Sequence, residues 1–131
     1  MVSFITSRQL KGLIENQRKD FQVVDLRRED FARDHITNAW HVPVTAQITE
    51  KQLNQLIKGL SDTFSSSQFV KVIFHCTGSK NRGPKVAAKF ETYLQEEDIT
   101  SKFESCILVG GFYAWETHCR ESNLKLIEID C

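Results

Sequence analysis

One short stretch of the sequence concentrates reactive side chains. The segment FVKVIFHCTGSKNRGP, residues 69–84, places Cys76 after a β-branched apolar run, and Arg82 follows six residues later. A thiolate is a strong nucleophile, and a helix N-terminus or nearby cations favour the thiolate form of a cysteine. Backbone N–H groups in a tight loop bind a tetrahedral oxyanion, and a guanidinium binds two of its oxygens. The spacing therefore predicts displacement at phosphorus or arsenic by sulfur.

The residues of this loop have different predicted roles. Cys76 is the candidate nucleophile and Arg82 the candidate clamp for the anion, so these two are the catalytic candidates. Gly78 lets the backbone approach the anion closely, and Lys80 adds positive charge at the mouth of the loop. The alternative is a buried structural cysteine beside a solvated arginine, but a polar loop is poorly suited to mere packing. The predicted oxyanion-binding residues are Thr77, Gly78, Ser79, Lys80, Asn81 and Arg82.

Three further residues are predicted to support the loop. His75 ends the strand, where it is expected to bond the loop backbone and hold its shape; direct proton transfer is the alternative. Asp25 and Arg27 follow another strand-like run, and we expect them to pair and brace the loop. A direct contact of Arg27 with substrate is the alternative. The other histidines, at positions 35, 41 and 118, are too scattered for a metal site, so no metal is predicted.

The segments around the loop alternate between strands and helices. Strand-like apolar runs are predicted at residues 21–26, 39–43, 69–75 and 105–110, and a loop at 62–68. Thr6 with Gln9, and Thr49 with Gln52, have the spacing of capping boxes that begin helices, and Pro84 suits the first turn of another helix. This alternation predicts an α/β fold with a mostly parallel central sheet, covered by helices on both faces. Ligands of such sheets bind beyond the carboxyl ends of the strands, where the Cys76 loop lies.

Composition excludes several classes of function. The sequence has 131 residues, which predicts a single domain over residues 1–131, and its 17 basic residues balance 17 acidic ones. We therefore expect no nucleic-acid or membrane partner, and no apolar run approaches the roughly 20 residues of a membrane helix. The beginning of the sequence lacks the pattern of a secretory signal, and its four cysteines form no C-x-x-C pair. We expect a cytoplasmic protein with reduced thiols.

Three ordered motifs resemble a known family. D-L-R at 25–27, with F-x-x-x-H-I-x-x-A-x-x-V-P at 31–43, resembles the amino-terminal motif of rhodanese-fold domains, and L-V-G-G-F-x-x-W at 108–115 resembles their carboxyl-terminal motif. Five residues separate the loop cysteine from its arginine, one more than in rhodanese-type sulfurtransferases. H-C-x5-R-G-P at 75–84 is similar to the mitotic-inducer dual-specificity phosphatases and, most closely, to the eukaryotic (fungal-type) arsenate reductases.

This resemblance implies a single rhodanese-like domain that reduces As(V) arsenate to As(III) arsenite in arsenic detoxification. Cys76 would attack arsenic with loss of water, giving a thiol–arsenate adduct held by the loop and Arg82. Glutathione would act as co-substrate and glutaredoxin as partner, with no tightly bound cofactor. The resemblance also implies a homodimer.

Two other functions remain as alternatives. A cysteine-based phosphatase needs an acid for its leaving group, yet residues 77–81 contain no Asp or Glu, and Gly83 stands where many cysteine phosphatases have a hydroxyl residue. An acid from elsewhere, at Glu29, Asp30 or Asp34, is still open. The third function is a catalytically idle rhodanese-like interaction module, against which the presence of both the cysteine and the arginine counts.

The remaining cysteines and the carboxyl-terminal aromatic residues are predicted to be structural. Cys106 lies in an apolar run and is expected to pack, Cys119 is expected to be passive, and Cys131 is given no role. An internal resolving thiol among them is the alternative to glutathione. The aromatic residues at 112, 113 and 115 are expected to cap a core rather than form a partner surface.

Overall fold

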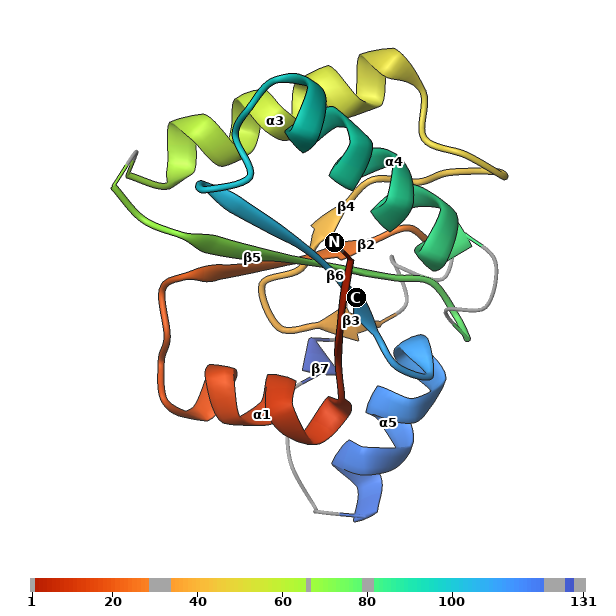
Figure 1. Cartoon of the computed structure of the whole chain (residues 1–131). Helices are drawn as coiled ribbons and strands as arrows, with labels where there is room; N and C mark the ends of the chain where they lie inside the picture. The colour runs from red at the N-terminus through yellow and green to blue at the C-terminus, as the bar shows by residue number, and fades with distance from the viewer. Residues whose placement is uncertain (1, 29–33, 66, 79–81, 122–126, 129–131) are drawn as a thin grey trace.

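A parallel sheet carries the predicted site at its edge. The computed structural model describes residues 2–28, 34–65, 67–78, 82–121 and 127–128 (Figure 1). The sheet has five strands in the order β1-β6-β5-β2-β4, and every neighbouring pair is parallel. These strands are β1 (Ser3–Ile5), β6 (Phe103–Leu108), β5 (Val70–His75), β2 (Phe21–Asp25) and β4 (Trp40–His41). A separate antiparallel pair joins β3 (His35–Ile36) to β7 (Ile127–Glu128).

Helices cover both faces of the sheet, as predicted. On one face lie α3 (Glu50–Thr63) and α4 (Arg82–Glu96), and on the other lie α1 (Ser7–Glu15) and α5 (Gly111–Glu121) (Figure 1). The α/β fold with a mostly parallel sheet between two helical layers is therefore confirmed. No helix among the described residues is both long and apolar enough to cross a membrane.

Each face of the sheet has its own hydrophobic core because side chains alternate along a strand. On β5, Val72 and Phe74 point toward α3 and α4, where Phe74 meets Phe90 edge-to-face with ring centroids 5.2 Å apart. Ile73 points to the other face, into the core that contains the fully buried Trp115. Burial of a side chain of this size contributes about 1.5–3 kcal/mol, so both layers hold the central strand in place.

Local sequence signals set the ends of the helices. Both predicted capping boxes are present: the Gln9 N–H donates to Thr6 Oγ1 at 3.1 Å, and the Gln52 N–H donates to Thr49 Oγ1 at the same distance. The predicted loop at 62–68 begins too early, because α3 continues to Thr63 and the Phe64 N–H still donates to the carbonyl of the preceding turn.

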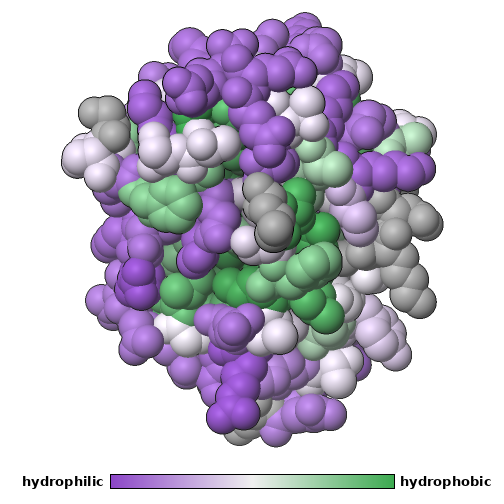
Figure 2. Space-filling view, viewed as in Figure 1, coloured by the Kyte–Doolittle hydropathy of each residue, from purple (hydrophilic) through white to green (hydrophobic). Residues whose placement is uncertain are grey.

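Several strand predictions need correction. The run predicted at 39–43 contains only β4, and β3 and β7 were not predicted. β6 spans Phe103–Leu108 rather than 105–110, because the backbone turns at Gly110 with φ of +76°. β1 was not predicted, since three residues give too short a pattern. It lies at the edge of the sheet, where Phe4 is 70% exposed. Figure 2, in the same view as Figure 1, shows hydrophobic surface across the middle of the molecule, between the two helical layers.

Candidate active site

Three strands end together at the carboxyl edge of the sheet. In the strand register, Asp25 at the end of β2 is opposite His75 on β5 and His41 on β4. The Leu26 N–H continues this pairing by donating to the His75 carbonyl at 2.9 Å. Because the strands are parallel, the segments that leave them all turn at the same edge. Cys76 is the first residue beyond β5.

The first turn of α5 holds the beginning of the cysteine loop. Cys76 is 4% exposed, and its carbonyl accepts a hydrogen bond from the Phe112 N–H at 3.0 Å. The Thr77 carbonyl accepts one from the Tyr113 N–H, also at 3.0 Å. These two N–H groups have no acceptor within their own helix, so the loop carbonyls satisfy them. The loop and α5 therefore fix each other.

The predicted clamp lies where the sequence places it, at the start of a helix. Arg82 is the first residue of α4 and is partly buried, with Nη1 3.4 Å from the Val44 carbonyl. Of the predicted oxyanion-binding residues, Thr77 is exposed and Gly78 is partly buried. The other three, residues 79–81, lie outside the described part of the chain.

Asp25 and Arg27 form the predicted pair beneath the loop. Arg27 Nε lies 3.1 Å from both carboxylate oxygens of Asp25, and Nη2 lies 2.8 Å from Oδ2. The side chains are 4% and 0% exposed for Arg27 and Asp25. Burial alone would raise the pKa of Asp25, but the interaction with His75 and the charge and hydrogen bonds of Arg27 outweigh burial and lower this pKa. Asp25 is therefore a buried carboxylate that is ion-paired with Arg27.

The remaining contacts of Arg27 hold it beneath the loop. Its guanidinium carbon lies 3.9 Å from the centre of the Phe112 ring, and Nη2 donates to the Asp34 carbonyl at 2.7 Å. The Asp34 carboxylate lies 3.8 Å from Nη1. The predicted pairing of Arg27 with Asp25 is present, and Phe112 connects Arg27 to the Cys76 carbonyl. The bracing of the loop by this pair stays a prediction. Of the three candidate leaving-group acids, Asp34 is ion-paired with Arg27, and Glu29 and Asp30 lie outside the described residues.

His75 shapes the loop through its backbone. The fully buried imidazole has Nδ1 3.1 Å from the Cys76 carbonyl, so Nδ1 is the protonated nitrogen. Nε2 then lies 3.6 Å from Asp25 Oδ2 as an acceptor facing an acceptor, and it has no hydrogen-bond partner among the described residues. Burial lowers the pKa of His75 more strongly than Asp25 raises it. The predicted bond from His75 to the loop backbone is confirmed, on a neutral ring.

Phe112 is a site residue that sequence reasoning assigned only to the core. Its ring stacks on His75, with centroids 6.2 Å apart, lies beneath Arg27, and its N–H bonds the Cys76 carbonyl. The sequence feature that could have identified it is its position directly after Gly110 and Gly111, at the end of a predicted strand. Of the other two aromatic residues, Trp115 is fully buried as expected, whereas Tyr113 is 71% exposed and does not cap a core.

The other described cysteines lie away from the loop. Cys106 and Cys119 are buried in the core on the α1 and α5 face, which confirms the packing role predicted for Cys106. Burial raises the pKa of Cys106 to about 12, with a further contribution from Glu104, so its thiol stays protonated at neutral pH. Cys131 lies outside the described residues.

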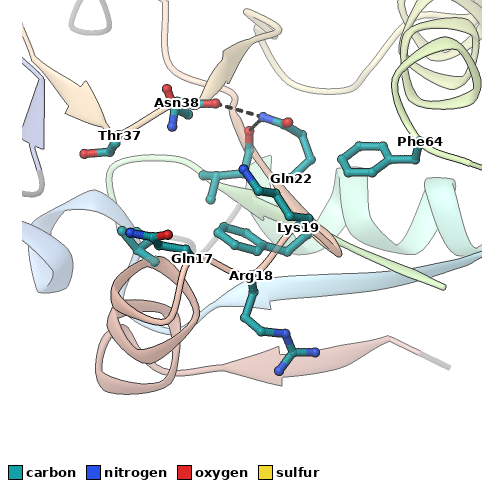
Figure 3. A pocket seen from close by; sticks show the side chains of 10 residues that line it. Gln17, Arg18, Lys19, Gln22, Thr37, Asn38 and Phe64 are labelled. Carbon is teal, nitrogen blue, oxygen red and sulfur yellow. Dashed lines mark hydrogen bonds between the residues drawn. The ribbon is translucent and has the colours of Figure 1, made fainter. Parts of the chain in front are cut away.

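A cavity of about 420 Å³ lies at the opposite edge of the sheet, near the start of β2 (Figure 3). Two of its polar side chains bond to neighbouring protein groups: Gln22 Nε2 donates to the carbonyls of Val23 and Asn38 at 3.0 Å, and Arg18 pairs with Asp20. Because this cavity is remote from the loop, it takes no part in the candidate site.

Together, the fold and the loop define a class of protein: a parallel α/β domain with a cysteine at a strand end and an arginine at the start of the next helix. Residues 6–118 match the family described as rhodanese-like domain. The chain therefore belongs to the rhodanese-like family.

Relatives of two kinds share this family. The chain is 32% identical over 112 residues to the CDC25-like phosphatase YCH1 of Saccharomyces cerevisiae, covering 82% of this chain and 73% of the relative. It is also 32% identical over 119 residues to arsenate reductase 2.2 of Oryza sativa subsp. japonica, covering 88% and 82%. The fold matches the structure of the As-Sb reductase from Leishmania major with a TM-score of 0.80 at 23% identity, over 98% of this chain and 86% of that one.

Proposed function

We propose that this protein is an arsenate reductase that converts As(V) arsenate to As(III) arsenite through a Cys76 thiol–arsenate adduct. The observation that carries the proposal is the cysteine loop itself. Its nucleophile directly follows a buried strand, the carbonyls of Cys76 and Thr77 accept hydrogen bonds from α5, and its arginine begins the next helix. The identity to a plant arsenate reductase supports the same activity.

The chain supplies positioning and charge for the reaction. The Cys76 sulfur attacks arsenic, one arsenate oxygen leaves as water, and the loop N–H groups with Arg82 bind the remaining oxygens. A glutathione thiol then attacks the Cys76 sulfur. The sulfur–arsenic electron pair stays on arsenic, which leaves as arsenite. A second glutathione releases Cys76 as the thiol, so two glutathiones become glutathione disulfide for each arsenate reduced.

The reductant and the setting are part of the proposal. Glutathione is the co-substrate and glutaredoxin the partner that removes glutathione from the mixed disulfide, with no tightly bound cofactor. A cytoplasmic location supports this chemistry because that compartment keeps thiols reduced. The biological role is arsenic detoxification. A homodimer, implied by the resemblance alone, stays a prediction.

A cysteine-based phosphatase is the second candidate, favoured by the identity to a protein named as a CDC25-like phosphatase. The site offers less support for this chemistry. A phosphomonoester needs a protonated acid at its leaving group, and Asp34 is held in an ion pair with Arg27. Arsenate has labile oxygens and needs no such strong acid.

The decisive experiment compares both activities in one preparation. NADPH-coupled arsenate reduction with glutathione, glutaredoxin and glutathione reductase is measured beside hydrolysis of an aryl phosphate. Cys76→Ser should abolish arsenate reduction, and Arg82→Ala should lower it by about 100- to 1000-fold because an oxyanion contact is lost. Arg28→Ala, an exposed arginine, is the matched control and should keep parental activity. Aryl phosphate turnover without arsenate-dependent oxidation of NADPH would overturn the proposal.

A further inference from the structure

The segment that leads from β4 to α3 passes the first turn of α4, where Arg82 lies (Figure 1). Arg82 Nη1 donates a long hydrogen bond of 3.4 Å to the carbonyl of Val44 in this segment. Val44 is buried in the core beneath α3 and α4, so its carbonyl has a fixed place. One nitrogen of the predicted clamp is therefore bound to the protein itself.

This contact uses the nitrogen of Arg82 that a side-on bidentate contact does not need. Arg27 shows such a contact in the same protein, because its Nε and Nη2 lie 3.1 and 2.8 Å from the Asp25 carboxylate. These two nitrogens form one edge of the guanidinium, and this edge matches two oxygens of an anion. With Nη1 bonded to Val44, Arg82 keeps the same edge for the oxyanion.

Two hydrogen bonds hold the peptide unit that precedes the Val44 carbonyl. The Val44 N–H donates to the Leu26 carbonyl at 3.2 Å, and the Pro43 carbonyl accepts from Gln52 Nε2 at 2.6 Å. A peptide unit is planar, so bonds to its N–H and its carbonyl together fix its orientation. The Leu26 N–H donates in turn to the His75 carbonyl, so the sheet sets one side of this unit. Gln52, in the first turn of α3, sets the other.

The side chain of Gln52 makes one contact more than its helix requires. Its Oε1 accepts from the Thr49 N–H at 3.0 Å, which completes the capping box, and its Nε2 is the donor to Pro43. Gln9 has the same position in the capping box of α1, where its Oε1 accepts from the Thr6 N–H at 2.8 Å. Within the described residues, Gln9 Nε2 donates to no other element. A capping box needs only the acceptor, since Glu serves there as well as Gln.

We propose that Gln52 is a positioning residue for the oxyanion clamp, an inference that rests on the proposed function for the identity of the anion. Gln52 Nε2 holds the Pro43 carbonyl, and the peptide unit fixed in this way orients the Val44 carbonyl. Val44 then holds Arg82 so that Nε and Nη2 bind two arsenate oxygens. Gln52 itself does not contact arsenate. Without its amide donor, Arg82 loses its fixed orientation and the affinity for the oxyanion decreases.

Gln52→Glu tests the inference because it removes the donor and retains the capping acceptor. Inorganic arsenate is titrated into Cys76→Ser protein, which forms no adduct, and is followed by amide chemical shifts. In this background Gln52→Glu should weaken arsenate binding about tenfold, the effect of one lost hydrogen bond. Gln9→Glu adds the same charge at the same helix position and should leave the affinity unchanged. Equal affinities of the two variants would overturn the inference.

A second comparison determines whether Gln52 acts through Arg82. Gln52→Glu should lower kcat/KM for arsenate about tenfold in the otherwise parental protein while the KM for glutathione stays unchanged. In an Arg82→Ala background the same substitution should have little further effect, because the residue that it positions is missing. An equal loss in both backgrounds would assign the effect to the added negative charge and would contradict a positioning role.

The two measurements separate this inference from the proposed function. If Gln52→Glu weakens arsenate binding but the parent reduces no arsenate, the positioning role stands and the proposed function fails. If the parent reduces arsenate and Gln52→Glu and Gln9→Glu behave alike in binding and turnover, the proposed function stands and Gln52 does not position the clamp.

Discussion

Asp25, Arg27 and His75 determine which charges are available to the Cys76 loop. Arg27 is ion-paired with Asp25 and lies over the Phe112 ring, so its charge is neutralised within the protein. His75 donates from Nδ1 to the Cys76 carbonyl and is neutral because burial lowers its pKa. Among the described residues, Arg82 is thus the cation placed to bind the oxyanion. The network of Asp25, Arg27 and His75 therefore acts on the shape of the loop and not on its charge.

The buried, neutral His75 makes stability depend on pH. Its pKa in the folded protein lies below the unfolded value of about 6.5, so the unfolded chain binds the proton more tightly. The contribution of neutral His75 to the free energy of unfolding is complete above about pH 6.5. As the pH falls below this value, the free energy of unfolding decreases by at most about 1.4 kcal/mol per pH unit. The free energy of unfolding, measured in urea from pH 7.5 to 5.5, should therefore decrease.

His75→Asn should flatten this decrease, because its amide can still donate to the Cys76 carbonyl but does not titrate. His35→Asn replaces a partly buried histidine of β3 in the same way and is the comparison variant. Equal slopes for the parent and His75→Asn would show that the pKa of His75 does not differ between the folded and unfolded protein, which contradicts this prediction.

Sequence reasoning identified the residues with distinctive chemistry and missed those that act through contacts. Cys76 and Arg82 were predicted from side-chain type and spacing, and the Asp25–Arg27 pair from opposite charges near a strand end. Phe112 was missed as a site residue because its role depends on a ring that meets His75 and Arg27 from another element. Such contacts between distant segments have no local signature in one sequence.

At the scale of elements, α5 holds the beginning of the cysteine loop through hydrogen bonds. Its first turn donates to the carbonyls of Cys76 and Thr77, and the turn before it depends on Gly110, with φ of +76°. A Cβ atom at Gly110 would lie 2.5 Å from the Cβ of Ala114. Only glycine therefore allows the chain to leave β6 and begin α5 within contact of the loop.

Gly110→Ala should reduce both stability and activity. The left-handed conformation alone costs an L-residue about 1–2 kcal/mol, and the overlap with Ala114 adds to this. Urea unfolding should show the loss, and arsenate turnover should fall because α5 shifts away from the loop. Gly12→Ala is the matched control: nothing lies within 4 Å of its Cβ, and alanine should stabilise the interior of α1 by about 0.5–1 kcal/mol. Parental stability and turnover in Gly110→Ala would contradict the bracing role.

Elements with strong local signals were predicted well, and those that depend on pairing were not. The capping boxes at Thr6 and Thr49 begin α1 and α3 as predicted, because the side chain and the N–H that it caps are only three residues apart. β1 has three residues and exists because β6 pairs with it along Ser3–Ile5. This partner is about a hundred residues away, so the sequence near β1 does not indicate a strand.

At the scale of the whole molecule, the sheet separates the described thiols. Cys76 packs into the core beneath α3 and α4, whereas Cys106 and Cys119 lie in the core beneath α1 and α5. Among these three cysteines none forms a disulfide. A disulfide needs Cα atoms within about 7 Å and facing Cβ atoms, which opposite faces of a sheet do not provide. In the proposed reaction, the thiol that attacks the Cys76 adduct therefore comes from outside these two cores.

Replacing Cys106, Cys119 and Cys131 by serine tests this separation. The triple variant should keep glutathione-dependent arsenate reduction close to the parental rate, because none of the three thiols is needed to release arsenite. Mass spectrometry of a reaction without glutaredoxin should find glutathione attached to Cys76 in the parent and in the variant alike. A buried serine costs some stability, so urea unfolding must first show that the variant is folded. A folded variant that forms the arsenate adduct but does not turn over would identify one of these cysteines as the resolving thiol. If that cysteine were Cys119, α5 would have to leave the sheet to bring it to the loop.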